Sequence, residues 1–459
     1  MGSNLFKAGG AYTVATFVLK GVNFFTIPIF THLLTVSQYG VVNNFTAWVS
    51  IFSIFVGFNL NASINTAYHE YREDFAKFLS SILWLSFFIF VSATLIGIIT
   101  IYFAINSYNI YFVLFVLIQS FVSFIISFQS TYYMIRNKYI SNIIVSFIST
   151  LLNVSLSLVL MNSIFSSQPD MGRIIGSTLG LSLLAVPLFI MISIRGKFYI
   201  FDKTYWLYAL KISLPLIPHA IGNFVISQFD RIMIQEINGN QSVGLYSFTY
   251  NIATIISVLW SASNNAWVPW FFKNFHNKAW ISIRKSANLF TSAFMILTVV
   301  LMPVSVELSG ILGSSNYSKG IVLIMPVTLG YFFQFLYGFP VNTEFVLKKT
   351  NFIGIGTGVA AVLNVVLNLL FLPRFGYMAA GYTTLITYIA LFIAHYFIAK
   401  KVSSQSVFDG YWLFYASCIM VIYMFLQILS VDTFWLRYLI MILFIVIIVL
   451  ITKKKLIGK

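Results

Sequence analysis

The sequence is organised as a series of long apolar runs, each close to the length that crosses a bilayer. A membrane-spanning helix needs about 20 mostly apolar residues. Only 8% of the 459 residues are charged, against about 25% in soluble domains, so a soluble fold could not bury this apolar surface. We therefore expect an all-α polytopic membrane protein with about fourteen transmembrane helices. The runs lie near residues 8–30, 40–65, 78–104, 111–134, 140–164, 172–194, 208–237, 243–272, 287–312, 320–346, 352–372, 378–400, 411–429 and 435–452.

Lys and Arg divide unevenly between the two sides that these runs define. One side holds 21 of the 27, the other holds five, and Lys20 lies inside the first run. Because cytoplasmic loops of membrane proteins are enriched in Lys and Arg, the distribution supports fourteen spans and predicts cytoplasmic N- and C-termini. The net charge of +16 is then explained by topology and by anionic membrane lipids, without nucleic acid.

A weak repeat relates the two halves of the chain at an offset of 204 residues. Gly40 follows the first span and Gly244 follows the seventh, and an Asn comes 21 residues after each, Asn61 and Asn265. The alternative is that Gly-capped turns recur by chance. Taken as real, the repeat is parallel, with a pseudo-twofold axis along the membrane normal. It predicts two pseudo-symmetric six-helix lobes, residues 1–200 and 201–402, followed by two C-terminal helices in residues 403–459.

Two similar lobes are the architecture of a rocking transporter, in which the substrate path runs between the lobes. Asn61 and Asn265, at equivalent positions of the repeat, are candidate substrate ligands. Lys20 is thirteen residues into the first span, too deep for its ammonium group to reach water easily. It either faces a cavity that receives an anionic substrate or pairs with another helix.

The seventh span carries the densest set of unusual residues. Pro215 and Pro218 permit a bend, and His219 follows them. His219 has no companions at metal-ligand spacing and is a candidate donor to a phosphate or sugar. Asp230 and Arg231 are neighbours, so they point about 100° apart on a helix and each needs its own partner. Arg231 is a candidate substrate ligand, or it reaches the outer interface.

Asp230 has a candidate environment in two later spans. Asn364 and Asn368 share one helix face, and Thr384 lies at a similar depth. One carboxylate, amide oxygens and a hydroxyl suit a hard monovalent cation such as sodium. The alternative is interhelical hydrogen bonding, for which Asn and Thr are common in membranes.

Three further residues have structural interpretations, and the absence of nucleotide motifs narrows the function. Glu344 and Glu307 lie near the ends of their spans and are expected at the interfaces. Cys418, the one cysteine, is expected to be a packing residue. The sequence contains no Walker motif, dinucleotide fingerprint or metal-ligand cluster. Transport driven by the chain's own nucleotide hydrolysis is therefore not expected. An enzyme is not expected either, because the longest outer loops between the predicted spans are only several residues.

The seventh span also carries a family resemblance. The runs LPLIPH (214–219), QFDRIMI (228–234) and VGLYS (243–247) resemble the signature of Wzx-type polysaccharide flippases. These belong to the multidrug/oligosaccharidyl-lipid/polysaccharide exporter superfamily, with the MurJ lipid II flippases and the MATE drug exporters. Span count and repeat extend the likeness over nearly the whole chain.

The resemblance implies alternating-access transfer of undecaprenyl-pyrophosphate-linked oligosaccharides to the outer leaflet, for O-antigen or another surface polysaccharide. A cationic cavity would grip the pyrophosphate, and Lys20, Arg231 and His219 would line it. Sodium-binding relatives imply a cation site, and the matching positions of this chain are Asp230, Asn364, Asn368 and Thr384. The single buried cation of the first lobe departs from the several arginines of MurJ-like proteins and argues against lipid II.

The same resemblance implies the setting and the partners. We expect a monomer in the bacterial cytoplasmic membrane, in contact with polysaccharide polymerase and chain-length machinery. No cofactor is expected besides sodium or a proton as coupling ion. The alternatives are a MATE-like cation-coupled exporter of small molecules, which should have an acidic pocket, and a polymerase or ligase, which should have substantial outer loops.

Overall fold

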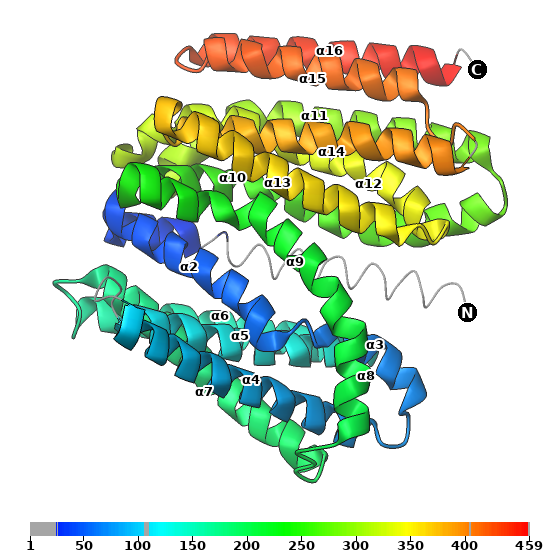
Figure 1. Cartoon of the computed structure of the whole chain (residues 1–459). Helices are drawn as coiled ribbons and strands as arrows, with labels where there is room; N and C mark the ends of the chain where they lie inside the picture. Colours follow the sequence, from blue (N-terminus) through cyan, green and yellow to red (C-terminus); the bar gives the residue numbers. More distant parts are fainter. Residues whose placement is uncertain (1–23, 25, 105–109, 404, 458–459) are drawn as a thin grey trace. The chain divides into compact units, whose positions relative to one another are not determined.

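The computed structural model describes residues 24, 26–104, 110–403 and 405–457, and nearly all of them are helical. The first predicted span, 8–30, and Lys20 lie mostly or wholly outside these residues. The helices are α2 (Val36–Gly57), α3 (Asn61–Glu70), α4 (Phe75–Ala104), α5 (Ile110–Ile135), α6 (Tyr139–Asn162), α7 (Pro169–Arg195), α8 (Lys203–Ser213), α9 (Ile217–Phe224), α10 (Asp230–His276), α11 (Trp280–Leu312), α12 (Ile324–Val346), α13 (Thr350–Phe375), α14 (Met378–Ser403), α15 (Gly410–Leu429) and α16 (Phe434–Ile457) (Figure 1). Short helical segments connect α8 to α9, α9 to α10 and α11 to α12.

Twelve helical stretches of the described chain are long and apolar enough to cross a membrane. They fall where the sequence places spans. The predicted seventh and eighth spans lie in one stretch of 74 residues, Lys203–His276, which contains two helices joined at a kink between the predicted spans. It is interrupted at Gly239, whose φ of 79° lies in a region that glycine adopts readily. The all-helical multi-span fold is confirmed, and the count of fourteen stays a prediction.

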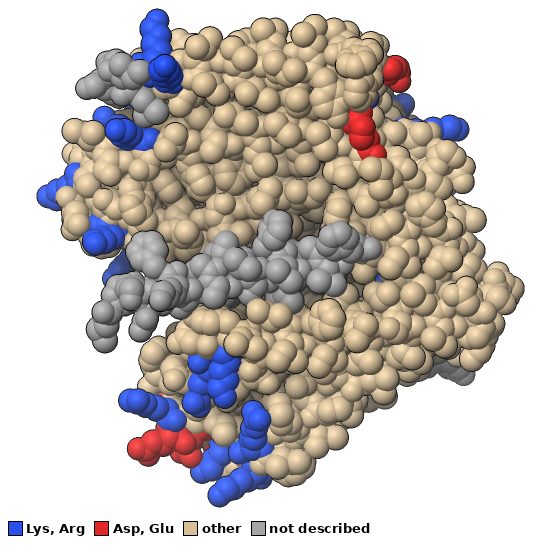
Figure 2. All heavy atoms as spheres, turned by 180° about the vertical axis from the view of Figure 1, so that it is seen from behind, with Lys and Arg blue, Asp and Glu red and all other residues tan. Residues whose placement is uncertain are grey.

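The surface of α13 shows how these helices meet their surroundings. Ile355, Val359 and Val362 lie on one face and are 65%, 63% and 64% exposed. Asn364 and Asn368 point to the interior instead and are fully buried. This apolar-out, polar-in arrangement is the reverse of a soluble helix and suits a lipid environment. Figure 2 shows wide surface without charged side chains, and Lys and Arg gathered toward the edges.

The chain separates into two compact units. One unit is residues 41–232, and the other combines the chain up to Gly40 with the chain from Met233 onward. The chain therefore passes from one unit to the other inside α2 and again inside α10. The lobe division at residues 200 and 402 stays a prediction.

Small residues hold the unit of residues 41–232 together at α6 and α7. Gly172, Gly176 and Gly180 follow one another every four residues along α7. A Cβ on any of them would press against the α6 backbone, at Ser157 in the case of Gly176. The glycines thus permit the close backbone approach that is common between membrane helices.

Helix α12 forms the centre of the other unit. Nearly all of its residues are buried, among them Phe335 and Phe339. The ring of Phe335 stacks on that of Phe294 from α11, with centroids 4.1 Å apart and an interplanar angle of 7°. Such aromatic pairs contribute about 0.5–1.5 kcal/mol beyond area burial. Helices α11, α13, α14 and α15 surround α12.

The C-terminal hairpin of α15 and α16, at the top of Figure 1, is fixed by an ion pair at each end. At one end, Nη2 of Arg437 lies 2.8 Å from Oε1 of Glu307 on α11. At the other end, Nζ of Lys455 lies 2.7 Å from Oδ2 of Asp409 and 4.7 Å from the centroid of the Trp412 ring. These contacts fix the hairpin against α11 and against its own first turn.

Candidate functional site

The seventh span is built from three kinds of helical backbone in five consecutive segments. Helix α8 runs into a 3₁₀ turn at Leu214–Leu216, followed by α9, a π-helical segment at Val225–Phe229 and then α10. Pro215 and Pro218 explain the 3₁₀ turn, because each lacks the N–H that an α-helix would bond. Mid-helix 3₁₀ and π segments frequently mark hinges and functional sites. The family-like motif residues 228–231 lie at the end of the π segment.

Asp230 and Arg231 are both buried where the π segment joins α10. Asp230 is 0% exposed and Arg231 3%. The Arg231 guanidinium donates from Nη1 to the carbonyl oxygen of Ser227, at 3.0 Å, so it lies back along its own helix. A charged pair at this depth of an apolar chain is expensive unless it serves a cavity or a partner. The burial keeps both residues as candidates for function.

The structure places the other predicted substrate ligands in varied surroundings. His219 shares a hydrogen bond of 3.1 Å between its Nε2 and Nδ2 of Asn223, one turn on. Asn61 begins α3 and donates from Nδ2 to Oγ of Ser127, at 2.9 Å. Asn265 is exposed on α10. Asn61, His219 and Arg231 belong to the unit of residues 41–232, and Asn265 belongs to the other.

Three of the four predicted cation ligands belong to the unit that holds α13 and α14, where they lie in or next to a buried polar ladder. Nδ2 of Asn368 donates to Oδ1 of Asn364 at 3.2 Å, and Oγ1 of Thr383 donates to Oδ1 of Asn368 at 2.6 Å. Nδ2 of Asn364 reaches Oγ1 of Thr387 at 3.5 Å. The ladder therefore uses Thr383 and Thr387, which the sequence prediction did not include, and Thr384 is buried beside them. Asp230 belongs to the other unit.

A buried acid and histidine in the same unit were not recognised from the sequence. Glu344 of α12 and His395 of α14 are both 0% exposed, and Oε1 of Glu344 lies 2.8 Å from Nδ1 of His395. The expectation that Glu344 lies at the interface is wrong, because α13 and α14 cover the end of α12. The signal was available: both residues lie near the same end of spans that run in the same direction.

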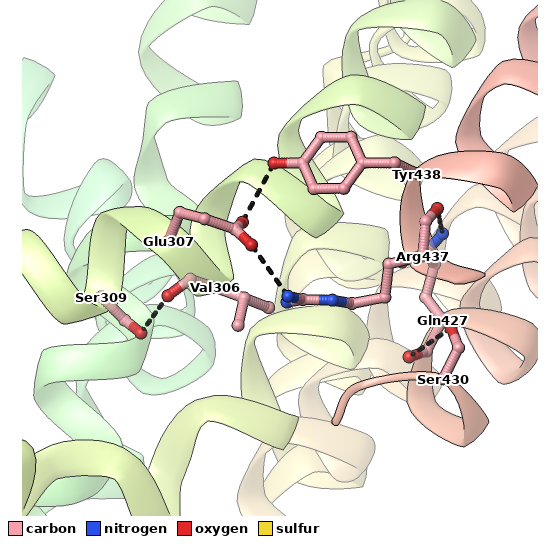
Figure 3. A network of polar contacts seen from close by, with 7 residues as sticks. All are labelled: Val306, Glu307, Ser309, Gln427, Ser430, Arg437 and Tyr438. Carbon is pink, nitrogen blue, oxygen red and sulfur yellow. Dashed lines mark hydrogen bonds and ion pairs between the residues drawn. The ribbon is translucent and has the colours of Figure 1, made fainter. Parts of the chain in front are cut away.

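Glu307 meets a polar network rather than open interface (Figure 3). Its two carboxylate oxygens accept from Arg437 and from the hydroxyl of Tyr438, the latter at 3.1 Å. Gln427 of α15 donates to the carbonyl of Arg437 at 3.1 Å. Since Glu307 remains 33% exposed while the Arg437 side chain is 6% exposed, the carboxylate neutralises a more deeply placed cation. This network is structural.

A large apolar groove runs between α14 and α15 and encloses about 1220 Å³. Along α14 it extends from Ile389 to Lys400, about 17 Å at 1.5 Å per residue. Its walls are mostly aromatic and aliphatic, whereas Arg284, Lys400 and Asp409 lie at one end. Asp409 is paired with Lys455, so the end is basic on balance.

Cys418 corrects a second expectation. It is an exposed free thiol on α15 and lines this groove, so the prediction of an enclosed packing residue is wrong. None of the predicted substrate ligands that the structure describes lines the groove. It was not predictable from the sequence, because its walls come from helices whose relative positions no local pattern reveals.

A family profile and proteins of known sequence match this chain. The profile of a family described as polysaccharide biosynthesis protein matches residues 5–275. An uncharacterized membrane protein of Haemophilus influenzae is 24% identical over 274 residues, 59% of this chain and 66% of that protein. This chain therefore spans just under two thirds of that relative's length.

Solved structures share the fold over most of the chain. The lipid II flippase MurJ, in an inward closed conformation, has a TM-score of 0.69 at 18% identity, covering 97% of this chain and 99% of that one. A transporter of the MOP superfamily from Pyrococcus furiosus has a TM-score of 0.57 at 14% identity, covering 87% and 96%. At these identities the likeness establishes the fold.

Proposed function

Because this chain belongs to the polysaccharide biosynthesis protein family, we propose that it flips undecaprenyl-pyrophosphate-linked oligosaccharides from the cytoplasmic to the outer leaflet. The units would supply O-antigen or another surface polysaccharide. Family and fold make the chain a multi-pass membrane transporter of the MOP superfamily, not an enzyme, and its relatives are bacterial. The identity of the substrate, the direction of its transfer between the leaflets and the coupling ion are the parts that we propose.

The groove between α14 and α15 is the observation that carries the proposal. A lipid-linked oligosaccharide combines a long apolar tail with an anionic pyrophosphate. The groove offers about 17 Å of apolar wall and ends at Arg284 and Lys400. Apolar surface binds the tail through burial, and the basic residues attract the phosphates. An exporter of small organic cations would need the opposite charge.

The polar headgroup needs its own route and a conformational change. The broken seventh span supplies segments that bend, as discontinuous helices do in other transporters. We assign headgroup contacts to Lys20, Arg231, His219, Asn61 and Asn265. These assignments rest on the sequence and on the burial of Arg231.

Transport against a gradient also needs an energy source. In this proposal a cation gradient supplies it, with sodium or a proton as the coupling ion. Sodium at Asp230, Asn364, Asn368 and Thr384 stays a prediction from the sequence. A proton site is argued in the next subsection.

The experiment is depletion of the chain in a bacterium that depends on it for surface polysaccharide. We expect single lipid-linked repeat units to accumulate on the cytoplasmic face of the membrane, where externally added glycosidase cannot reach them. Accumulation on the outer face would contradict flipping and favour a polymerase or ligase. Unchanged surface polysaccharide together with sensitivity to organic cations would favour a MATE-like exporter.

A further inference from the structure

Glu344 and His395 form a buried acid and base pair across two helices of the proposed transporter. Both side chains are 0% exposed, and Oε1 of Glu344 lies 2.8 Å from Nδ1 of His395. The pair joins α12 to α14 at a sequence separation of 51 residues. Burying ionisable groups in a membrane protein costs free energy. A buried pair that can gain or lose a proton is therefore a candidate functional site.

Within the described part of the chain, each partner has one polar atom without a hydrogen-bond partner. These atoms are Oε2 of Glu344 and Nε2 of His395, and both are buried. Most buried polar side-chain atoms in folded proteins are satisfied. Two orphaned atoms on the same pair are therefore places where a proton or a water molecule can bind.

Among the residues that the structure describes, the surroundings of the pair hold no cation paired with it. On α12, the ring of Tyr337 stands edge-on to His395, with centroids 5.0 Å apart. Helix α13 presents Gly356, where a Cβ would collide with Nε2 of His395, and Thr357, which does not titrate. Among the ion pairs formed by described residues, no Lys or Arg partners Glu344.

The charge of the pair then depends on one proton. With a single proton on the bond between Nδ1 and Oε1, His395 is neutral, Glu344 is a carboxylate and the net charge is −1. A second proton, on Nε2 of His395 or Oε2 of Glu344, brings the net charge to zero.

We propose that Glu344 and His395 form a proton-binding site that takes up and releases one proton in each transport cycle. This inference rests on the proposed function, since it names the coupling ion for that transporter. The neutral, proton-loaded pair stabilises the conformation in which the site is dry. Release of the proton leaves a charge that needs water and so favours a conformation that hydrates the site. A ligand can shift a conformational equilibrium only through such a difference in affinity.

The position of the pair fits proton exchange with one side of the membrane. His395 lies eight residues before the end of α14 at Ser403, about 12 Å along the helix. Lys400 and Lys401 lie between the two, and Lys348 and Lys349 follow α12. The charge distribution assigns this end to the cytoplasm, so the proton's path to that side is short.

The first test detects proton binding without transport. We expect pH-difference infrared spectra of the purified protein to contain a protonation band, from the Glu344 carboxyl or the His395 imidazolium, that Glu344→Gln removes and Glu307→Gln keeps. Glu307 is the matched control, an acid of the same unit that is paired with Arg437. If Glu344→Gln does not fold, His395→Gln must remove the band or shift the pH at which it appears. A protonation band insensitive to both substitutions would overturn the proton site.

The second test measures coupling in proteoliposomes. We expect a pH gradient to speed the transfer of a polyprenyl-pyrophosphate oligosaccharide at least tenfold, and Glu344→Gln to abolish this acceleration while Glu307→Gln preserves it. If the rate of transfer by the wild-type protein does not depend on the pH gradient, the proton proposal alone is overturned. Absence of any transfer, with the infrared titration intact, would contradict the proposed function and leave the proton site standing.

Discussion

Gly40 of α2 and Gly244 of α10 pack backbone against backbone in a reciprocal contact. A Cβ on Gly40 would collide with the carbonyl oxygen of Asn240, and a Cβ on Gly244 would collide with that of Val36. Asn240 follows Val36 by 204 residues, the same offset that relates the two glycines. Reciprocal contact between equivalent residues is the mark of a twofold relation. The contact therefore supports the sequence repeat against the alternative of chance.

Gly244→Ala should separate the two helices locally. The added methyl group meets backbone, which cannot move aside cheaply, so we expect a loss of about 1–3 kcal/mol of stability and slower transport. Thermal unfolding of the purified protein measures the first effect. Gly354→Ala on α13 is the control, because no described atom beyond the neighbouring backbone of its own helix lies within 4 Å of its Cβ position. Equal unfolding midpoints for the two variants would contradict the close contact.

Asp409 should make stability depend on pH. Burial raises the pKa of Asp409, but the Lys455 ammonium and the backbone N–H of Trp412 lower it more, and the net pKa lies below its ordinary value. The stabilisation is therefore present above the unfolded-state pKa of about 3.9 and lost as the pH falls through the folded-state value.

The corresponding experiment compares unfolding midpoints of the wild type and Asp409→Asn from neutral pH downward. We expect the two midpoints to converge in acid. Asp409→Ala should cost about 1 kcal/mol more, since Asp409 also caps α15 through its bond to Trp412. A difference between wild type and Asp409→Asn that persists unchanged in acid would show that the ion pair is not its source.

Asn368→Ala should weaken the packing of α13 on α14. It removes the partners of Asn364 and Thr383, and hydrogen bonds between membrane helices contribute about 0.6 kcal/mol on average.

If the predicted sodium site exists, replacing choline by sodium should also raise the unfolding midpoint of the wild type, and Asp230→Asn should remove that rise. Identical midpoints in both salts would exclude sodium.

Cys418 offers a direct probe of the groove. It is the one cysteine of the chain and lines the groove as an exposed thiol. We expect a polyprenyl pyrophosphate to protect it from a thiol reagent, and labelling with a bulky reagent to slow transport. Cys418→Ser labelled in the same way should transport normally. Labelling rates unaffected by the lipid would argue against the groove as the tail site.

The sequence predicts the helices well because lipid imposes a simple rule. Each span must be long, apolar and internally hydrogen-bonded, so its position can be predicted from the sequence without knowledge of its neighbours. The division between the seventh and eighth spans follows the same rule, because the non-helical residue Gly239 lies between the predicted spans 208–237 and 243–272.

The site was less predictable because its important contacts are tertiary. The Asn364 and Asn368 face was legible from their spacing of four residues, but their partners Thr383 and Thr387 depend on how α13 meets α14. Glu344 and His395 are 51 residues apart, and only packing brings them together. Comparing the depths of polar residues in parallel spans would have suggested the pair.

The central claim is that this chain moves a lipid-linked oligosaccharide across a bilayer. The direct measurement places the purified protein in liposomes with a labelled undecaprenyl-pyrophosphate oligosaccharide and follows the fraction open to an external glycosidase. We predict that this fraction rises with time, and that Arg231→Ala slows the rise roughly tenfold or more, since a charge-assisted hydrogen bond contributes about 1.5–3 kcal/mol. A fraction that stays equal to that of protein-free liposomes would contradict the account.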